Sequence, residues 1–404
     1  MNRPHGRDPL VLAVCTLGLA QITAWGTSFY CLGVLAKPIV AETGWSTSLA
    51  YFGFTVALLA MGAISAWAGR AIDRYGARAV MTAGTLMVSA GLYALSQVTS
   101  EGAYLAVWAF LGLGMRLCLY DAAFAALVQV VPSRGRMAIS YLTLFGAFAS
   151  TVFWVVGHYF NEAVGWRQTL VLFAGINLAV CLPLNWIGLA RKEAAGKSEA
   201  TADGNSARDG SLLHGVQRTI AIALFALVMS LNSFVFGVVS VQLVPLLEAA
   251  GLATAAAVWV ASMKGFAQFG GRVVEIAFGR NLHAVTVGRL AIGILPFSFV
   301  LLLASDGNVV AIVAFTLLMG ASQGVITIVR GAVPLALFGQ AGYGAVLGLL
   351  ATPVLIVNAA APTLFALIIE RWGWLAGQMA LIAASAASCV AMEMMARWYR
   401  RSRS

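Results

Sequence analysis

Residues 69–78 read Gly-Arg-Ala-Ile-Asp-Arg-Tyr-Gly-Ala-Arg, a short charged segment with a long apolar stretch on either side. Each flanking stretch holds about the 20 apolar residues that a helix needs to cross the hydrocarbon core of a bilayer. The segment is therefore expected to be a loop at a membrane surface that joins two membrane-spanning helices. Gly69 and Gly76 permit a close helix approach and a tight turn, and Asp73 can cap a helix end.

The composition of the whole chain agrees with a membrane protein. Of its 404 residues, 61% are apolar and 10% are charged, whereas soluble domains carry about 25% charged residues. This excludes a water-soluble enzyme, a disordered protein and a secreted disulfide scaffold. Twelve apolar windows of span length are expected at about 10–36, 48–69, 79–98, 103–131, 138–160, 167–189, 218–246, 254–279, 285–304, 309–332, 342–368 and 375–396. The fold class is therefore an all-α integral membrane protein with twelve transmembrane helices.

The twelve windows fall into two sets of six. Residues 191–217 form the only long polar stretch, rich in Gly, Ser, Ala and mixed charges, and such a composition is typical of a flexible linker. The expected domains are a six-helix bundle over 1–190, a cytoplasmic linker over 191–217 and a second bundle over 218–404. The segment Glu-Ala-Val-Gly-Trp at 162–166 recurs as Glu-Arg-Trp-Gly-Trp at 370–374, which indicates two pseudo-symmetric halves.

The positions of Lys and Arg predict the orientation, because cytoplasmic loops carry an excess of these residues. Most of the 25 Lys and Arg residues fall in segments on one side, whereas Lys37, Arg167 and Arg371 fall on the other. Both termini are therefore expected in the cytoplasm of a multi-pass protein of the bacterial inner membrane. The net charge of +10 then faces anionic lipid headgroups, and no nucleic-acid partner is expected.

The loop at 69–78 resembles the G-x-x-x-D-R-x-G-x-R loop of the major facilitator superfamily, at the place where that family has it. With the twelve windows and the central linker, the resemblance covers the whole chain. In general texture the sequence is similar to bacterial members related to monocarboxylate carriers, a neighbourhood that also includes riboflavin importers and arsenite exporters. The resemblance implies the family fold of two six-helix bundles, a solute site between them, and a cytoplasmic latch at Gly69, Asp73, Arg74, Gly76 and Arg78.

Ionic groups inside the spans are the main candidates for function, because an intramembrane charge is costly and needs a partner or water. Lys264, Gln268, Arg272 and Glu275 fall within an arc of about 80° on one span, and Gln323, Thr327 and Arg330 share about 60° on another. The substrate-binding candidates among them are Arg116, Lys264, Gln268, Gln323 and Arg330. Asp121, Arg272 and Glu275 are candidates either for ion pairs that hold helices in register or for proton coupling. Arg330 has the alternative of reaching the headgroups.

Aromatic residues are the other candidates for a pocket. Gln21, Trp25, Ser28 and Phe29 share an arc of about 100° on the first span, and Tyr120 lies beside Arg116 and Asp121 in the chain. The alternative is that such residues are lipid-facing filler or interface anchors, as is expected for most of the 11 tryptophans.

The function expected is secondary active transport of a small organic solute by alternating access, with possible coupling to protons. The cationic and aromatic candidates favour an organic anion such as a carboxylate, or a planar vitamin such as riboflavin. Export of arsenite or drugs is the alternative, and for arsenite Cys31 and Cys118 would matter. An enzyme is not expected, because the four histidines form no catalytic pair in the sequence. No cofactor or metal is expected, and the protein is expected to act as a monomer in the lipid bilayer.

Overall fold

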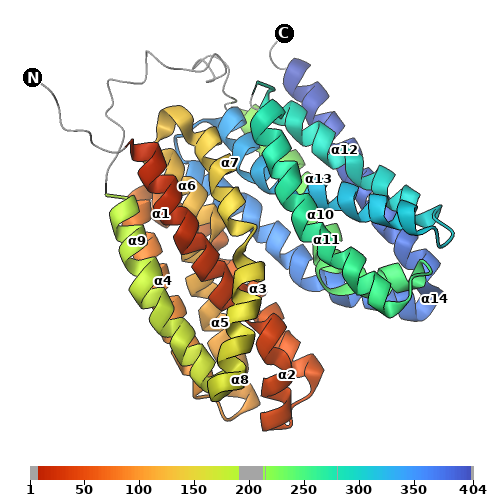
Figure 1. Cartoon of the computed structure of the whole chain (residues 1–404). Helices are drawn as coiled ribbons and strands as arrows, with labels where there is room; N and C mark the ends of the chain where they lie inside the picture. Colours follow the sequence, from red (N-terminus) through yellow and green to blue (C-terminus); the bar gives the residue numbers. More distant parts are fainter. Residues whose placement is uncertain (1–7, 191–212, 214, 280, 402–404) are drawn as a thin grey trace, which may run out of the picture. The chain divides into compact units, whose positions relative to one another are not determined.

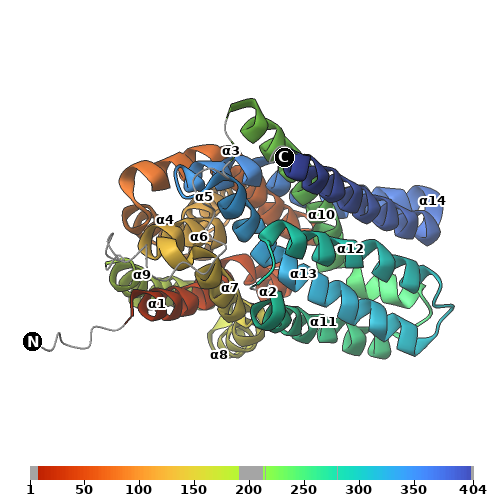
Figure 2. The same cartoon turned by 90° about the horizontal axis from the view of Figure 1, so that it is seen from above.

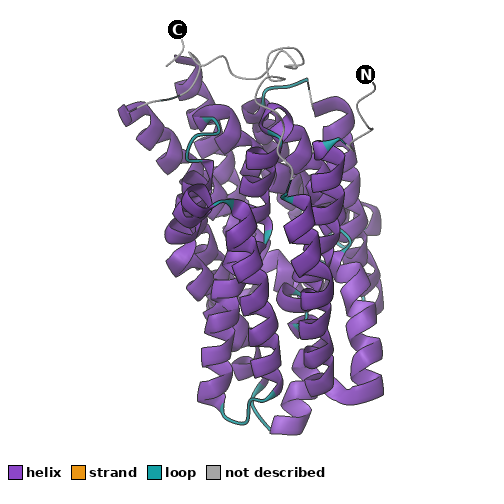
Figure 3. Ribbon diagram, turned by 90° about the vertical axis from the view of Figure 1, so that its left-hand side faces the viewer, coloured by secondary structure: helices purple, strands orange, loops and turns teal. Residues whose placement is uncertain are grey.

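The computed structural model describes residues 8–190, 213, 215–279 and 281–401. Over these ranges the chain is helical and contains no strand (Figure 3). The predicted all-α fold is thus confirmed. Of the predicted linker, residues 191–212 and 214 lie outside the described ranges, and helix α10 begins at Gly215.

The chain divides into two compact units. Unit 1 comprises the described residues of 1–206 together with Gln340–Thr352, and unit 2 comprises the described residues of Ala207–Gly339 and Pro353–Ser404. Unit 1 therefore includes a short segment from far along the sequence, the start of helix α14.

Unit 1 is built from the first helices of the chain (Figure 1). They are α1 Pro9–Ala24, η1 Trp25–Phe29, α2 Leu32–Thr43, α3 Thr47–Tyr75, α4 Ala77–Ser96, α5 Glu101–Cys118, α6 Tyr120–Val130, η2 Pro132–Arg134, α7 Gly135–Gly146, α8 Ala149–Ile176, η3 Asn177–Cys181 and α9 Leu182–Gly188. Helix α1 lies between α7 and α9 in both Figure 1 and Figure 2, and it packs against both.

Unit 2 contains the later helices. They are α10 Gly215–Ala249, α11 Thr254–Val274, η6 Glu275–Gly279, α12 Ala284–Leu303, α13 Val309–Phe338 and the part of α14 (Tyr343–Arg401) that follows Thr352. Helix α13 packs along both α11 and α12.

The described residues contain nine helical stretches that are long and apolar enough to cross a membrane. Two of these stretches, over Pro132–Gly188 and Tyr343–Arg401, are far longer than one span. Each is interrupted by a glycine with non-helical backbone, Gly165 in α8 and Gly373 in α14. Both interruptions lie where the sequence predicts loops between spans, and the total of twelve spans stays a prediction.

The two interrupting glycines have nearly the same conformation. Gly165 has φ 79° and ψ 165°, and Gly373 has φ 82° and ψ 175°. A positive φ is sterically easy for glycine alone. The repeated motif at 162–166 and 370–374 therefore corresponds to the same sharp turn in each unit, as expected for related halves.

Small residues let the helices of unit 1 approach one another closely, as is typical of membrane helix packing. Gly112 of α5 lies against α3 so closely that a β-carbon there would overlap the carbonyl oxygen of Ala57. The hydroxyl of Tyr104 on α5 donates to the carbonyl of Ala50 at 2.7 Å. These contacts fix α5, which carries the first group of candidate site residues.

Candidate functional site

The fourth predicted span is broken in its middle. Helix α5 ends at Cys118, α6 begins at Tyr120, and Leu119 between them has an extended backbone (φ −82°, ψ −165°). A carbonyl at the end of a helix has no partner in that helix. The Nε2 of Gln21 on α1 donates to the carbonyl of Cys118 at 2.8 Å and so satisfies it. The Oε1 of Gln21 accepts from the indole of Trp25 at 3.1 Å, so one glutamine stabilises the break and orients an aromatic candidate.

An ion pair bridges the break. Arg116 Nη1 lies 2.8 Å from Asp121 Oδ2, and both side chains are buried, with exposed fractions of 3% and 7%. Arg116 lies in the last turn of α5 and Asp121 in the first turn of α6, where each charge is favoured by the helix dipole. Asp121, a candidate for an ion pair or for proton coupling, thus forms an ion pair, and its partner is Arg116, which the sequence predicts as a substrate-binding residue.

Aromatic rings gather beside the break and form what we call the aromatic cluster, composed of Trp25, Phe29, Phe54, Tyr120 and Phe124. Trp25 lies 4.9 Å from Tyr120 and 4.6 Å from Phe29, measured between ring centroids. Tyr120 stacks on Phe124 at 5.3 Å with the ring planes 14° apart, and Phe29 meets Phe54 edge-on at 4.8 Å. Trp25, Phe29 and Tyr120 are only partly buried, so they keep ring surface that a solute can contact.

Two residues of the aromatic cluster, Trp25 and Phe29, lie in a π-helical segment, η1. A second π-helical segment, η3, begins at Asn177. The Nδ2 of Asn177 donates to the hydroxyl of Thr27 at 2.7 Å, so the two segments are directly bonded to each other. Such segments are rare and occur frequently at functional sites.

Unit 2 contains the second group of candidates. Lys264 on α11 is half-buried, and its ammonium lies 5.6 Å from the centroid of the Phe236 ring on α10. It makes no hydrogen bond or ion pair with any residue that the structure describes. Gln323 on α13 is buried, with an exposed fraction of 4%. Neither polar atom of the Gln323 side chain has a hydrogen-bond partner in the described part of the chain.

The predicted polar stripe of α11 lies along its seam with α13. A β-carbon at Gly324 would overlap the carbonyl of Gln268, and one at Gly320 would press on the backbone of Lys264. The Nε of Arg272, which is buried, donates to the carbonyl of Gly324 at 3.3 Å. The glycines of α13 thus allow the polar face of α11 to lie directly on that helix.

The remaining candidates of unit 2 lie toward one end of the same two helices. Glu275 is buried and is the first residue of the π-helical segment η6, and Arg330 of α13 is half-buried. Both make further polar or ring contacts within the protein.

The sequence predicts a loop over residues 69–78, but residues 69–75 form the last turns of α3, and only Gly76 separates α3 from α4, which begins at Ala77. This end of α3 meets the start of α14 within unit 1. The carboxylate of Asp73 accepts hydrogen bonds from the backbone N–H groups of Gly344 at 3.0 Å and Ala345 at 2.7 Å. A β-carbon on Gly69 would overlap the carbonyl oxygen of Gly344, so glycine is needed for the approach. Gly76 has φ 84° and ends α3.

Two of the three arginines of residues 69–78, Arg74 and Arg78, lie against aromatic rings. The guanidinium of Arg74 lies 5.2 Å from the ring centroid of Tyr75, and that of Arg78 lies 3.6 Å from the ring centroid of Trp186 on α9. Gly344 and Ala345 were not among the sequence candidates. The only sequence signal for them is the set of small residues Gly342, Gly344, Ala345 and Gly348.

The model of the family described as Major Facilitator Superfamily matches residues 17–288. The chain belongs to this superfamily. Among proteins of known structure, it is similar to the human organic anion transporter MFSD10 (TETRAN), with a TM-score of 0.75 and 14% identity over 96% of this chain and all of that one. It is also similar to FucP in its outward conformation, with a TM-score of 0.72 and 14% identity over 96% of this chain and 99% of that one.

The proton:xylose symporter XylE matches with a TM-score of 0.71 and 14% identity over 96% of this chain and 95% of that one. At such identities these structures show the fold alone. The multidrug resistance protein MdtL of Citrobacter koseri is 25% identical over 170 residues, which are 42% of this chain and 43% of that protein. The match thus spans less than half of the relative. The chain is a multi-pass membrane transporter, as members of its superfamily carry small-molecule solutes.

Proposed function

We propose that this transporter moves a small organic anion across the bacterial inner membrane, with both termini cytoplasmic, and that Lys264 binds the anion. The observation that carries this proposal is the ammonium of Lys264, which is half-buried in a membrane-spanning unit without an acidic partner among the described residues. A cation inside the bilayer is costly unless it is paired or hydrated. A carboxylate on the solute would supply that partner.

Gln323 supports the same proposal. Its amide offers a donor and an acceptor, both buried and both without partners in the part of unit 2 that the structure describes. Buried polar groups are normally hydrogen-bonded. A solute with a second polar group would satisfy this amide, and Gln268 and Arg330 on the same two helices are the further candidates for contact.

The aromatic cluster of unit 1 favours a solute that carries a planar ring. Trp25, Phe29 and Tyr120 keep exposed ring surface, and a well-placed aromatic contact is worth about 0.5–1.5 kcal/mol beyond its burial. An aromatic carboxylate or a flavin-like vitamin has both an anionic group and a ring. Arg116 already holds Asp121, so we assign it to the support of this cluster and place the anion at Lys264.

We further propose that a proton gradient drives transport. Among the residues that the structure describes, the buried acids are Asp121 of α6 and Glu275 of η6. If protonation of Glu275 couples transport, Glu275→Gln keeps solute exchange between equal pools and loses accumulation against a gradient. If Glu275 only holds α11 in register, both activities fall together.

Drug export is a second candidate, because the chain resembles MdtL over part of its length. Arsenite export has less support. Of the two thiols that the sequence suggests for arsenite, that of Cys31 donates to the backbone carbonyl of Ser28, and that of Cys118 is buried at the end of α5. No group of three or more His, Cys, Asp or Glu residues gathers as a metal site in the described ranges.

The test begins with a thermal-shift screen of the purified protein against carboxylates, flavins, cationic dyes and arsenite. For any compound that stabilises the protein, uptake is then measured in proteoliposomes that contain the full chain. For an anionic hit, Lys264→Gln is expected to weaken binding about tenfold or more, since a hydrogen bond to a charged group is worth about 1.5–3 kcal/mol. Lys37→Gln, at an exposed lysine of α2, is the matched control and leaves binding unchanged. Stabilisation by cationic dyes alone, or an unchanged affinity in Lys264→Gln, would overturn the proposal.

A further inference from the structure

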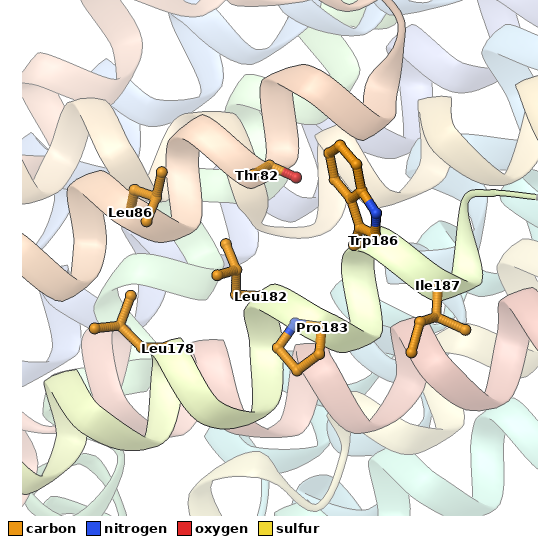
Figure 4. A pocket seen from close by; sticks show the side chains of 7 residues that line it. All are labelled: Thr82, Leu86, Leu178, Leu182, Pro183, Trp186 and Ile187. Atoms are coloured by element: carbon orange, nitrogen blue, oxygen red, sulfur yellow. The ribbon is translucent and has the colours of Figure 1, made fainter.

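An apolar groove runs along the outside of unit 1, between α4 and the stretch formed by η3 and α9. It has a volume of about 560 Å³ and is lined by Thr82, Leu86, Leu178, Leu182, Pro183, Trp186 and Ile187 (Figure 4). Several of these apolar side chains are exposed, and the exposed fraction is 47% for Leu86 and 42% for Leu178. In a chain that spans a membrane, lipid is the molecule that meets such a surface.

The groove has a polar end and an apolar end. Arg78, Thr82 and Leu86 follow one another at intervals of four residues along α4, and so lie on one face of it. On the opposite wall, Trp186 meets Arg78 and Thr82, whereas Leu178 lies near Leu86 at the far end (Figure 4). The groove therefore changes from cationic and aromatic to aliphatic within two helical turns.

The polar end of the groove contains polar side chains without hydrogen-bond partners among the described residues. Arg78 makes no hydrogen bond or ion pair within the described residues, and its guanidinium lies 3.6 Å from the centroid of the Trp186 ring. The Thr82 hydroxyl likewise has no partner there. This is unusual for the helix, because the nearby hydroxyl of Thr85 donates to the carbonyl of Met81 at 2.9 Å and accepts from Asn185 at 3.1 Å.

We propose that the groove binds one anionic phospholipid, with its phosphate on Arg78, its glycerol ester region beside Thr82 and one acyl chain along Leu86, Leu178 and Leu182. The planar guanidinium fork matches a phosphate geometrically, and Trp186 is the type of residue found at headgroup depth. From Arg78 to Leu86 the helix rises by about 12 Å, which suits the span from a phosphate to the upper part of an acyl chain. The positive-inside rule places this end of α4 at the cytoplasmic leaflet.

Charge, and not apolar contact, makes the site selective. An acyl chain gains little on leaving bulk lipid for the groove, because lipid tails are as apolar as leucine. The attraction between an anionic headgroup and Arg78 has no such competitor. The groove is therefore expected to prefer phosphatidylglycerol to phosphatidylcholine, which has a similar acyl region and no net charge.

The experiment is native mass spectrometry of the full-length protein, released from detergent that contains equal amounts of the two lipids. The wild type is expected to retain one phosphatidylglycerol at least threefold more than phosphatidylcholine. Arg78→Gln removes the preference. Arg74→Gln is the matched control: it removes the same charge from the end of α3, four residues before Arg78, at a side chain that lies against Tyr75, and it keeps the preference.

A second variant tests the apolar part. Leu182→Trp fills the groove and leaves Arg78 in place, so it is expected to lower retention of phosphatidylglycerol threefold or more. The proposal is overturned by equal retention of both lipids in the wild type, which is what bulk lipid alone would give. It is also overturned if Arg74→Gln lowers the preference as much as Arg78→Gln does. Retention is compared only between variants that elute as the wild type does, and the Arg78→Gln and Arg74→Gln pair remains decisive if Leu182→Trp does not fold.

Discussion

The side-chain amide of Asn177 donates a hydrogen bond to the hydroxyl of Thr27 at 2.7 Å, and this bond joins the two π-helical segments of unit 1. Both groups are buried, so water cannot replace either partner. The bond holds the backbone that carries Trp25 and Phe29.

Breaking this bond should destabilise unit 1, and the effects of substituting its two partners should not be additive. Thr27→Val and Asn177→Leu each remove one partner, and Thr27→Val also loses the bond from Thr27 to the carbonyl of Thr23. A double-mutant cycle isolates the shared bond, and a coupling free energy of about 1 kcal/mol is expected. The measurement is chemical unfolding in mixed micelles. Strictly additive effects would show that the bond contributes nothing.

Removing one partner of the Arg116–Asp121 pair should be strongly destabilising. Arg116→Met or Asp121→Asn leaves a buried charge without its partner, at a cost of about 3–5 kcal/mol. The double variant Arg116→Met/Asp121→Leu removes both charges and is expected to recover most of that loss. Melting temperatures of the three purified proteins check this. A double variant less stable than both singles would contradict it.

The close approach of the end of α3 to the start of α14 should depend on Gly69. Gly69→Ala places a methyl group on the backbone carbonyl of Gly344, and backbone cannot move aside as a side chain can. We expect loss of the Asp73 hydrogen bonds, seen as faster hydrogen exchange at the amides of Gly344 and Ala345. Gly102→Ala is the control, because a β-carbon there meets no atom within 4 Å. Equal exchange in Gly69→Ala and the wild type would remove the assigned role of Gly69.

The turns at Gly165 and Gly373 should respond alike to substitution. Both glycines have φ near 80° with an extended ψ, a region that is essentially restricted to glycine and costs another residue about 1–3 kcal/mol. Alanine at either position is therefore expected to lower the free energy of unfolding by that amount. Gly175→Ala, at a helical glycine with open space around it, should be neutral or stabilising. A large effect at one turn and none at the other would argue against related halves.

The sequence predicts what depends on composition and local turn chemistry. Span-length apolar windows indicate membrane-spanning helices. The turns at Gly165, Gly373 and Gly76 depend on glycine, the residue that adopts a positive φ without steric cost. The family follows from the loop at 69–78. The helical arcs also place Lys264, Gln268 and Arg272 on one face of α11, which is the face that the structure packs on α13.

Other features depend on contacts between distant residues and left no local signal. No glycine or proline marks the break at Leu119, which is supported from another helix by Gln21. In an unbroken helix, Arg116 and Asp121 lie about 140° apart and cannot meet. The break itself brings them to 2.8 Å. The π-helical segment at Trp25–Phe29 is similar, because its bond to Asn177 comes from a residue far along the chain.

A span that is cut at Leu119 behaves as two short rods and not as one. The angle between the rods can change through a single residue, without melting the hydrogen bonds inside either. The Arg116–Asp121 pair connects the two sides of this joint, and Gln21 holds the end of the first rod from α1, so both limit how far the joint can bend. Since Tyr120 is the first residue of the second rod, a tilt at the joint would carry its ring along and alter the stacking surface offered to a solute.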